Sequence, residues 1–423
     1  MRDKIRKAGG SLALILVIAF GLRAGFAWHE ERKIPADLVG SVPFLNETGN
    51  VARSLALGNG FGSVFRNDTG PTAWLTPVYP LLVAGIFRVF GIFTPGSFFA
   101  VVLLNILFST AACVPIFLAG KRIGGLGVAS GAAWLWAVFP NAIVIPYEWV
   151  WDTSLSALLG ATILWATLEL GESRGLRDWC AYGLLWGLAL MTNPSLGSLL
   201  PFLLGWAVYR ARQAGFLRWE KPLLCGAVVI ICCVPWTVRN YTVFHRFIPL
   251  RSNLPFELWI GNNEVFDENS RDVTARVTSY EQVSMYSKLG ETAFLDDKWH
   301  KAIQFMRDHR RLELELTRRR IVAFWMGSET PVRSFLETDS NFIRAILLLN
   351  LLATVGTLAG MVVLWRRRST FAFPVAVIPV VFPLLYYVTH ASLRYRHPID
   401  PVMLLLTAVA IGAAFRTRWP RSS

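Results

Sequence analysis

Charged residues are scarce in this sequence. Only 17% of its 423 residues are Asp, Glu, Lys or Arg, whereas 54% are hydrophobic. A soluble protein of this length needs more polar residues to cover its surface. The composition therefore argues against a soluble globular protein and favours an integral membrane protein.

Acidic residues are the scarcer charged class, with 28 Asp and Glu against 42 Lys and Arg, which gives a net charge of +14. Such an excess also occurs in proteins that bind nucleic acid. Here, however, the basic residues fall mostly in short clusters between apolar runs, as the topology signals of membrane proteins do. We therefore expect membrane lipids, and no nucleic acid, as partners.

Residues and motifs for metal or nucleotide binding are also few. The five cysteines lie in or beside apolar segments, and none has metal-ligand spacing with a histidine, so we interpret them as small buried hydrophobic residues. The chain has no Walker-type phosphate loop and no dinucleotide-binding glycine motif after a strand. These absences argue against a soluble ATP or nucleotide-sugar site.

Long apolar stretches are frequent. A crossing helix needs about 20 mostly apolar residues, because lipid offers no hydrogen-bond partner to an exposed peptide group. The stretches that meet or approach this length are 10–28, 97–119, 124–145, 153–170, 179–194, 196–210, 222–238, 341–365, 370–388 and 398–415. We predict an all-α polytopic membrane protein with about ten transmembrane helices.

The loops between these stretches follow an alternating charge pattern. If the N-terminus is cytoplasmic, every second loop should be basic. The clusters at 2–7, 121–122, 174–177, 210–221, 366–368 and 416–421 fit that rule. We expect a multi-pass protein of the cytoplasmic (inner) membrane with both termini in the cytoplasm. Its first helix is expected to be retained, with Arg23 either snorkelling outward or facing a polar cavity.

Two longer regions then lie at the outer face. The first outer loop, 29–96, contains the amphipathic stretch 47–57 and the apolar stretch 78–93, which we interpret as interfacial helices. Region 239–338 is polar and is expected to form a small helical cap. We predict three parts: a membrane module at 1–238, the outer loop and cap at 239–338, and C-terminal transmembrane helices at 339–423.

Carboxylates at the outer face are the first candidates for chemistry. Glu47 begins a helix-like run, and Glu148 and Asp152 lie at the outer end of two spans. A carboxylate at the mouth of a membrane cavity can act as a general base or hold a divalent metal. The alternative is that these residues are solvated at the interface.

Arginines gather at the same face, in Arg239-Asn240 and in Arg394-Tyr395-Arg396. The planar guanidinium suits phosphate because it stays charged and donates paired hydrogen bonds. The alternative is attraction to anionic lipid headgroups, which explains less well why these arginines stand beside Asn, Tyr and Pro at helix ends.

Short motifs carry a resemblance along nearly the whole chain. After the first-loop carboxylate they are Ala52 to Phe61, Gly70 to Leu82, Asn193-Pro194, Pro235-Trp236 with Arg239-Asn240, Gly261-Asn262-Asn263, Phe324 to Gly327, and Arg394-Tyr395-Arg396 before Pro398. In this order the chain resembles the GT-C glycosyltransferases. Within them it is most similar to the bacterial branch of protein O-mannosyltransferases, aminoarabinose transferase and lipopolysaccharide-core galacturonosyltransferases.

The resemblance implies transfer of a sugar from a polyprenyl-phosphate donor to a glycan, lipid or protein acceptor at the outer face. Glu47 then matches the base that deprotonates the acceptor, and Asp152, with Glu148 as its rival, the second acidic position. Arg239, Asn240, Arg394, Tyr395 and Arg396 stand where lipid-phosphate contacts are expected. The chain departs from relatives in having Glu at the first position and Thr76 where some have lysine, which makes a phosphate contact from Thr76 weaker or indirect.

No cofactor is required by these residues, although a divalent metal stays open. Two rival functions are a transporter or flippase of lipid-linked saccharide and a non-catalytic membrane relative. A transporter tends to show paired repeats and ionisable residues near the bilayer midplane, whereas the charges here cluster at one face. Convergence of the predicted side chains on one cavity would favour the enzyme.

Overall fold

The structure is a computed structural model that describes residues 2–415 apart from 34–43, 45, 66–67, 149, 174 and 264–278. The described residues form helices, and their one β-type pairing is an isolated bridge between Gly62 and Pro71. The predicted all-α class is therefore confirmed. The basic side chains at 2–7, at 174 and at 416–421 lie outside the described part of the chain.

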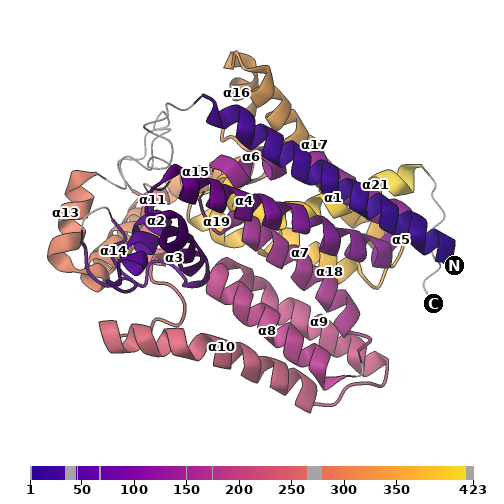
Figure 1. Ribbon diagram of the computed structural model, residues 1–423, viewed down its shortest axis with the longest axis horizontal. Helices are drawn as coiled ribbons and strands as arrows, with labels where there is room; N and C mark the ends of the chain where they lie inside the picture. The colour runs from indigo at the N-terminus through magenta and orange to yellow at the C-terminus, as the bar shows by residue number, and fades with distance from the viewer. Residues whose placement is uncertain are drawn as a thin grey trace.

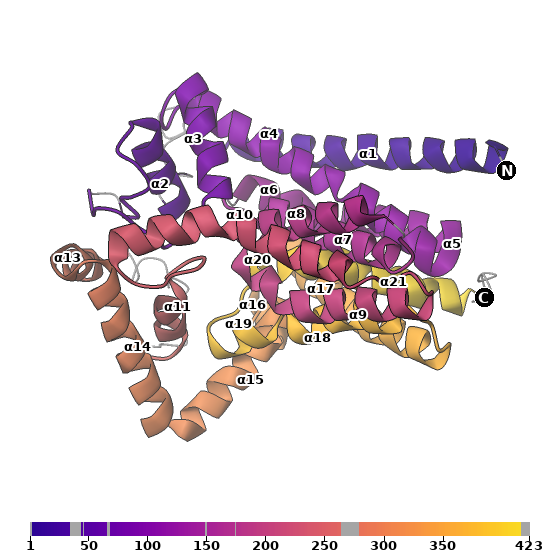
Figure 2. The same cartoon turned by 90° about the horizontal axis from the view of Figure 1, so that it is seen from below.

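Most helices form a bundle with its ends clearly distinguished (Figures 1 and 2). Helix α1 begins and helix α21 ends at one end of the bundle, and α2, α11, α13 and α14 lie at the other. The bundle comprises α1 (Arg2–Glu31), α4 (Pro95–Ala111), α5 (Cys113–Val138), α6 (Pro140–Glu148), α7 (Thr153–Leu170), α8 (Leu176–Thr192), η2 (Pro194–Leu199), α9 (Leu200–Gln213), α10 (Glu220–Phe244), α17 (Asn341–Arg366), α18 (Ala372–Val381), α19 (Leu384–Val388), α20 (Leu393–Arg396), η3 (His397–Ile399) and α21 (Asp400–Ala414).

By length and composition, 6 helical stretches of the described chain can cross a membrane. They are Leu12–Glu31, Pro95–Val138, Thr153–Leu170, Glu220–Phe244, Asn341–Arg366 and Leu393–Ala414. The predicted spans 179–194 and 196–210 are absent from this set, because α8 has only 17 residues and Pro194 starts a 3-10 turn before α9. The predicted span 370–388 corresponds to the shorter apolar helix Ala372–Val388.

The 44-residue stretch Pro95–Val138 changes direction at Gly125, whose φ of 77° and ψ of −168° are not helical. The two sides of this turn approach closely, since a Cβ on Gly120 would lie 2.8 Å from the Cα of Ala129. Glycine is the residue that readily adopts the backbone conformation at position 125, and its lack of a Cβ permits the close contact at position 120. The break separates the two spans that the sequence predicts at 97–119 and 124–145.

Arg23 points into the bundle and is fully buried. Its guanidinium donates hydrogen bonds to Ser109 Oγ at 2.9 Å and to the carbonyl oxygens of Ala137 at 3.1 Å and Trp136 at 3.2 Å. These carbonyls belong to the last turn of α5, where carbonyl groups have few partners within the helix. Of the two sequence interpretations, outward snorkelling is therefore wrong, and the side chain satisfies a helix end inside the bundle.

The opposite end carries the interfacial helices and the cap: α2 (Glu47–Ala56), α3 (Val78–Phe90), α11 (Leu254–Gly261), α13 (Tyr280–Leu289), α14 (Glu291–Asp308), α15 (Arg310–Met326) and α16 (Pro331–Glu337). A separate apolar cluster lies here and includes Phe65, Trp74, Phe256, Tyr286 and Phe294. Because its members come from both the first outer loop and the cap, the cluster packs these two regions together. The boundaries predicted at 238 and 338 stay a prediction.

The Glu291 carboxylate reinforces this packing. It accepts hydrogen bonds from the backbone N–H of Ala73 at 2.8 Å and the hydroxyls of Ser252 at 2.7 Å and Tyr286 at 2.8 Å, and also from the Thr72 hydroxyl. Glu291 is 4% exposed, so a buried charge holds the first outer loop against the cap. This arrangement fixes the wall of the cavity described next.

Candidate active site

A cavity of about 100 Å³ lies where the bundle meets the outer loop and cap. Six parts of the chain line it: the start of α2, residues 74–75, the α6–α7 connection, Asn193, residues 251–257 and residues 385–398. Its charged and titratable side chains are Glu47, Asp152, Arg251, Glu257, Tyr386, His390, Arg394 and Tyr395. Such a volume holds reacting groups and several waters but not a whole lipid-linked sugar, most of which must lie outside it.

Glu47 is placed at the cavity by the start of α2. The side chain of Asn46 caps this helix by accepting a hydrogen bond from the Gly49 N–H at 2.9 Å. Gly49 permits a close approach, since a Cβ there would lie 2.1 Å from the Phe44 carbonyl oxygen. Burial raises the pKa of Glu47, an effect that the nearby positive charge of Arg394 partly opposes. The group is therefore a stronger base than an exposed glutamate.

Asp152 immediately precedes α7 and faces the same cavity. Ser156 Oγ donates a hydrogen bond to its Oδ2 at 2.8 Å, and Asn193 Nδ2 donates to the same Ser156 oxygen at 3.2 Å. Burial raises the pKa of Asp152, while the Ser156 hydrogen bond and the charges of Arg251 and Arg394 act in the opposite direction. The Asn193-Pro194 motif thus contributes to orienting this carboxylate.

Arg394 contacts two aromatic rings at the cavity wall. Its guanidinium carbon is 3.8 Å from the Trp151 ring centroid and 4.6 Å from that of Tyr395. One nitrogen donates to the Tyr395 hydroxyl at 2.5 Å. These contacts and the hydrogen bond hold the guanidinium in place, and Arg394 belongs to the cavity lining.

A chain of polar contacts continues from Tyr395. His390 Nε2 lies 2.8 Å from the Tyr395 hydroxyl, and His390 Nδ1 lies 3.3 Å from Glu257 Oε2. Asn253 Nδ2 donates to Glu257 Oε1 at 2.8 Å. Burial lowers the pKa of His390, and the negative charge of Glu257 partly offsets that effect. The neutral imidazole is therefore favoured more than in an exposed histidine, and its two nitrogens lie beside Tyr395 and Glu257.

Arg239 and Asn240 do not line this cavity. The Arg239 guanidinium donates to the carbonyl oxygens of Thr72 and Phe61, each at 2.6 Å, and lies 5.1 Å from the Trp236 ring centroid. Asn240 donates to the Ile248 carbonyl oxygen at 3.0 Å. Both side chains hold the outer loop and the end of α10 in place.

Arg396, Thr76 and Glu148 also lie away from the cavity lining. Arg396 is fully buried and forms an ion pair with Asp400 at 2.7 Å, and it also donates to the Trp325 carbonyl oxygen at 2.7 Å. Thr76 donates to the Thr192 carbonyl oxygen at 2.7 Å. Glu148 is exposed at the end of α6. Of the two rival carboxylates, only Asp152 faces the cavity.

The sequence interpretation missed Arg251, Glu257 and His390. His390 stands in the segment just before Arg394, and Glu257 is the only acidic residue of the apolar helix α11, next to the Gly261-Asn262-Asn263 motif. A lone carboxylate in an apolar helix is costly unless it has a partner, and this was the available signal. Arg251 follows α10 in an irregular segment, so no periodic pattern marked it.

Among the described residues, no group of three or more His, Cys, Asp or Glu side chains is arranged to hold a metal ion. The cavity does combine carboxylates with arginines and a histidine. Carboxylates of raised pKa can take a proton from a hydroxyl, and stacked arginines can hold a phosphate. The arrangement suits attack by a hydroxyl on a phosphate-activated carbon.

Comparison with known proteins gives an independent view of the fold. The model of the dolichyl-phosphate-mannose-protein mannosyltransferase family matches residues 74–238. No curated protein sequence matches the chain significantly.

One similar solved structure is the oligosaccharyltransferase AglB of Archaeoglobus fulgidus, in complex with an inhibitory peptide and a dolichol-phosphate. Its TM-score is 0.56 and its sequence identity is 14%. The match covers 97% of this chain and 51% of the AglB chain. Its apo form gives a TM-score of 0.54 at 13% identity, over 96% and 50%. ArnT of Cupriavidus metallidurans, bound to undecaprenyl phosphate, has 15% identity over 95% and 77%, with a TM-score of 0.43.

A TM-score below 0.5 does not establish a common fold, so the shared fold is that of the archaeal oligosaccharyltransferase. The chain spans about half the length of that enzyme. These matches confirm the resemblance to the GT-C glycosyltransferases that the sequence motifs indicate.

Proposed function

We propose that this chain, which has a GT-C glycosyltransferase fold, transfers a sugar from a polyprenyl-phosphate carrier to an acceptor. The observation that carries the proposal is the convergence of Glu47, Asp152 and Arg394 on one cavity, from segments more than a hundred residues apart in the sequence. A transporter or a non-catalytic relative has no need of this combination. The acceptor is a glycan, lipid or protein with a free nucleophilic group.

In the proposed reaction Glu47 is the general base. Its carboxylate takes the proton of the acceptor hydroxyl, the hydroxyl oxygen bonds to the anomeric carbon, and the bond from that carbon to the phosphate oxygen breaks. The products are the glycosylated acceptor and a polyprenyl phosphate, which takes the bonding electrons. A base in this position contributes roughly 10²–10⁴-fold to the rate.

Arg394 is proposed to bind the phosphate, whose charge grows as the bond breaks. Its guanidinium is already oriented by Trp151 and Tyr395, so little reorganisation accompanies the reaction. Arg251 lines the same cavity and supplies a second positive charge. Asp152 is proposed to orient a sugar or acceptor hydroxyl opposite these cations.

We assign scaffolding roles to Arg239, Asn240, Arg396 and Thr76. Each donates hydrogen bonds to protein oxygens and lies outside the cavity lining. Removal of any of them is therefore expected to affect folding more than chemistry.

The cavity is proposed to open on the outer side of the cytoplasmic membrane, with both termini in the cytoplasm. Two observations support this orientation. Helices α2 and α11, which contribute to the cavity lining, lie at the end of the bundle remote from the start of α1 and the end of α21 (Figure 2). The basic clusters of the short loops follow the alternation that the positive-inside rule predicts for cytoplasmic termini. A lipid-linked donor then reaches the cavity sideways from the outer leaflet.

The proposal is tested by reconstituting the purified chain in liposomes that contain the lipid-linked sugars extracted from a deletion strain. Mass spectrometry of that strain identifies the donor that accumulates. We expect wild-type protein to convert this donor to free polyprenyl phosphate and Glu47→Gln to slow the conversion at least about 100-fold. Unchanged donor pools in the deletion strain, or full activity of a correctly inserted Glu47→Gln protein, would overturn the proposal.

A further inference from the structure

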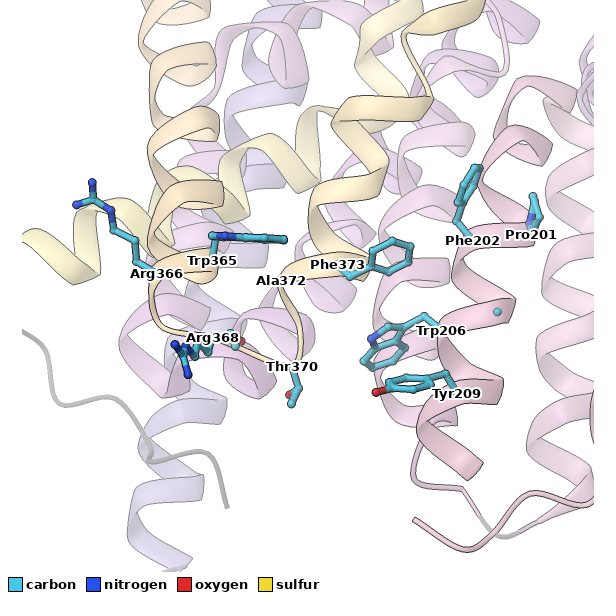
Figure 3. Close-up of a pocket in the computed structure, with 12 residues that line it drawn as sticks. Pro201, Phe202, Trp206, Tyr209, Trp365, Arg366, Arg368, Thr370, Ala372 and Phe373 are labelled. Atoms are coloured by element: carbon cyan, nitrogen blue, oxygen red, sulfur yellow. The ribbon is translucent and has the colours of Figure 1, made fainter. Parts of the chain in front are cut away.

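A second, larger groove lies on the flank of the bundle, far from the cavity with the carboxylates. It has a volume of about 910 Å³ and is lined by α9, the end of α17 and the start of α18. Its apolar lining includes Phe202, Trp206, Tyr209, Trp365 and Phe373. Figure 3 shows the aromatic side chains of α9 on one side of the groove and Trp365 and Phe373 on the other.

One end of this groove is polar. The polar lining consists of Arg366, the last residue of α17, and of Arg368, Ser369 and Thr370 in the segment that joins α17 to α18. Arg368 and Thr370 lie together at this end of the groove in Figure 3. Both arginines are exposed, whereas Trp206 on the opposite wall is 7% exposed. The groove thus combines an apolar slot with a basic, hydroxyl-rich end.

The polar end is remote from the outer cavity. Helix α18 starts at Ala372, and α19 follows it and leads to Thr389 and His390, which line that cavity. Likewise α9 follows Asn193, which lines the cavity, and ends at Gln213. The start of α18 and the end of α9 are therefore at the opposite end of the bundle, beside the basic loops 210–221 and 366–368.

We propose that this groove binds an anionic glycerophospholipid of the cytoplasmic leaflet. One acyl chain lies between α9 and α18, in contact with Trp206 and Phe373, and the phosphate contacts Arg368 and Thr370. The volume is within the range of small-molecule sites, roughly 300–1,000 Å³. Basic pockets between transmembrane helices on the cytoplasmic side are suited to anionic headgroups.

Charge complementarity selects this occupant. A zwitterionic lipid would fill the apolar slot equally well but would bring a positive choline or ethanolamine group close to Arg366 and Arg368. A lipid-linked sugar would need its phosphate at the outer cavity, at the other end of the molecule. An anionic phospholipid matches both the slot and the basic end.

Native mass spectrometry of protein released from nanodiscs tests the proposal. Nanodiscs of dioleoyl phosphatidylglycerol and of dioleoyl phosphatidylcholine are compared, followed by an equimolar mixture that also contains polyprenyl phosphate. We expect one phosphatidylglycerol to remain bound, and the double variant Arg366→Gln/Arg368→Gln to lower its retention by roughly tenfold. The matched control Lys121→Gln/Arg177→Gln removes two exposed basic side chains outside the groove and should retain the lipid.

A third variant fills the slot without altering charge. A Cβ added at Gly205 meets no atom within 4 Å, so Gly205→Leu places its side chain in open space and leaves the helix intact. It should displace phosphatidylglycerol as strongly as loss of the two arginines does. Equal retention in the groove variants and the control, or preferred retention of phosphatidylcholine or polyprenyl phosphate, would overturn the proposal.

Discussion

The guanidinium carbon of Arg394 lies 3.8 Å from the ring centroid of Trp151, so the cation lies against the indole in the wall of the outer cavity. Asp152 is the next residue after Trp151. The same turn of chain therefore places a carboxylate and the platform for a phosphate-binding arginine side by side. This coupling makes the behaviour of Arg394 variants informative.

Arg394→Gln should lower kcat for sugar transfer by roughly 10²–10³-fold, because a charge that stabilises the leaving phosphate is lost. Arg394→Lys should recover only part of that loss, since an ammonium group neither stacks flat on Trp151 nor donates paired hydrogen bonds. Initial rates at saturating donor measure both. Wild-type kcat in Arg394→Lys would show that the planar geometry is unimportant.

The pH dependence of transfer follows from the raised pKa of Glu47. The base form is lost as the pH falls through that pKa, so the acidic limb of kcat/KM should lie at higher pH than the ordinary glutamate value of about 4.3. His390 titrates in the same cavity, and the His390→Gln variant identifies its contribution. A limb that disappears in His390→Gln would assign it to the histidine and contradict the role of Glu47.

Glu291→Gln should destabilise the folded protein and leave the chemistry of the remaining folded molecules intact. The NH₂ group of the glutamine would face the N–H of Ala73 and the hydroxyls of Ser252 and Tyr286, which already donate hydrogen bonds. The mismatch should lower the free energy of unfolding by roughly 1–3 kcal/mol. The midpoint of thermal unfolding in detergent should fall, whereas Asp308→Asn, a change at an exposed carboxylate of the same helix α14, should leave it nearly unchanged. Equal midpoints for the two variants would show that Glu291 does not hold the loop to the cap.

The orientation in the membrane is checked by cysteine labelling of intact cells. Asn59→Cys and Arg218→Cys introduce thiols at exposed positions in the first outer loop and in the basic loop before α10. A membrane-impermeant maleimide should label Asn59→Cys from outside, above the level of the unmodified protein, and leave Arg218→Cys unlabelled until the cells are opened. The reverse pattern would place the cavity in the cytoplasm.

Hydropathy and charge patterns predicted the helices well, because lipid imposes a minimum length and polarity on each crossing segment. They also placed Glu47, Asp152 and Arg394 at one face, and the structure brings these three into one cavity. The direction in which each side chain points could not be predicted from these patterns. Arg396 is two residues from Arg394 on one short helix, yet it turns inward to Asp400.

The fate of Arg239 follows from a similar limit of sequence patterns. Its position at the outer end of α10 was predicted, but its hydrogen bonds reach carbonyls in a loop more than a hundred residues away. Such a pairing depends on how the outer loop folds, which has no periodic pattern. The sequence also could not decide which of Asp152 and Glu148 is the second functional carboxylate. Only Asp152 lines the cavity, and this depends on the irregular connection between α6 and α7.

The most direct test of the account compares Asp152→Asn with Glu148→Gln in the reconstituted transfer assay. The two changes neutralise carboxylates four residues apart, of which only Asp152 lines the cavity. We expect Asp152→Asn to lower release of polyprenyl phosphate by at least about 100-fold, and Glu148→Gln to stay within about twofold of wild type. Loss of activity in Glu148→Gln with wild-type activity in Asp152→Asn would contradict the assignment of this cavity as the active site.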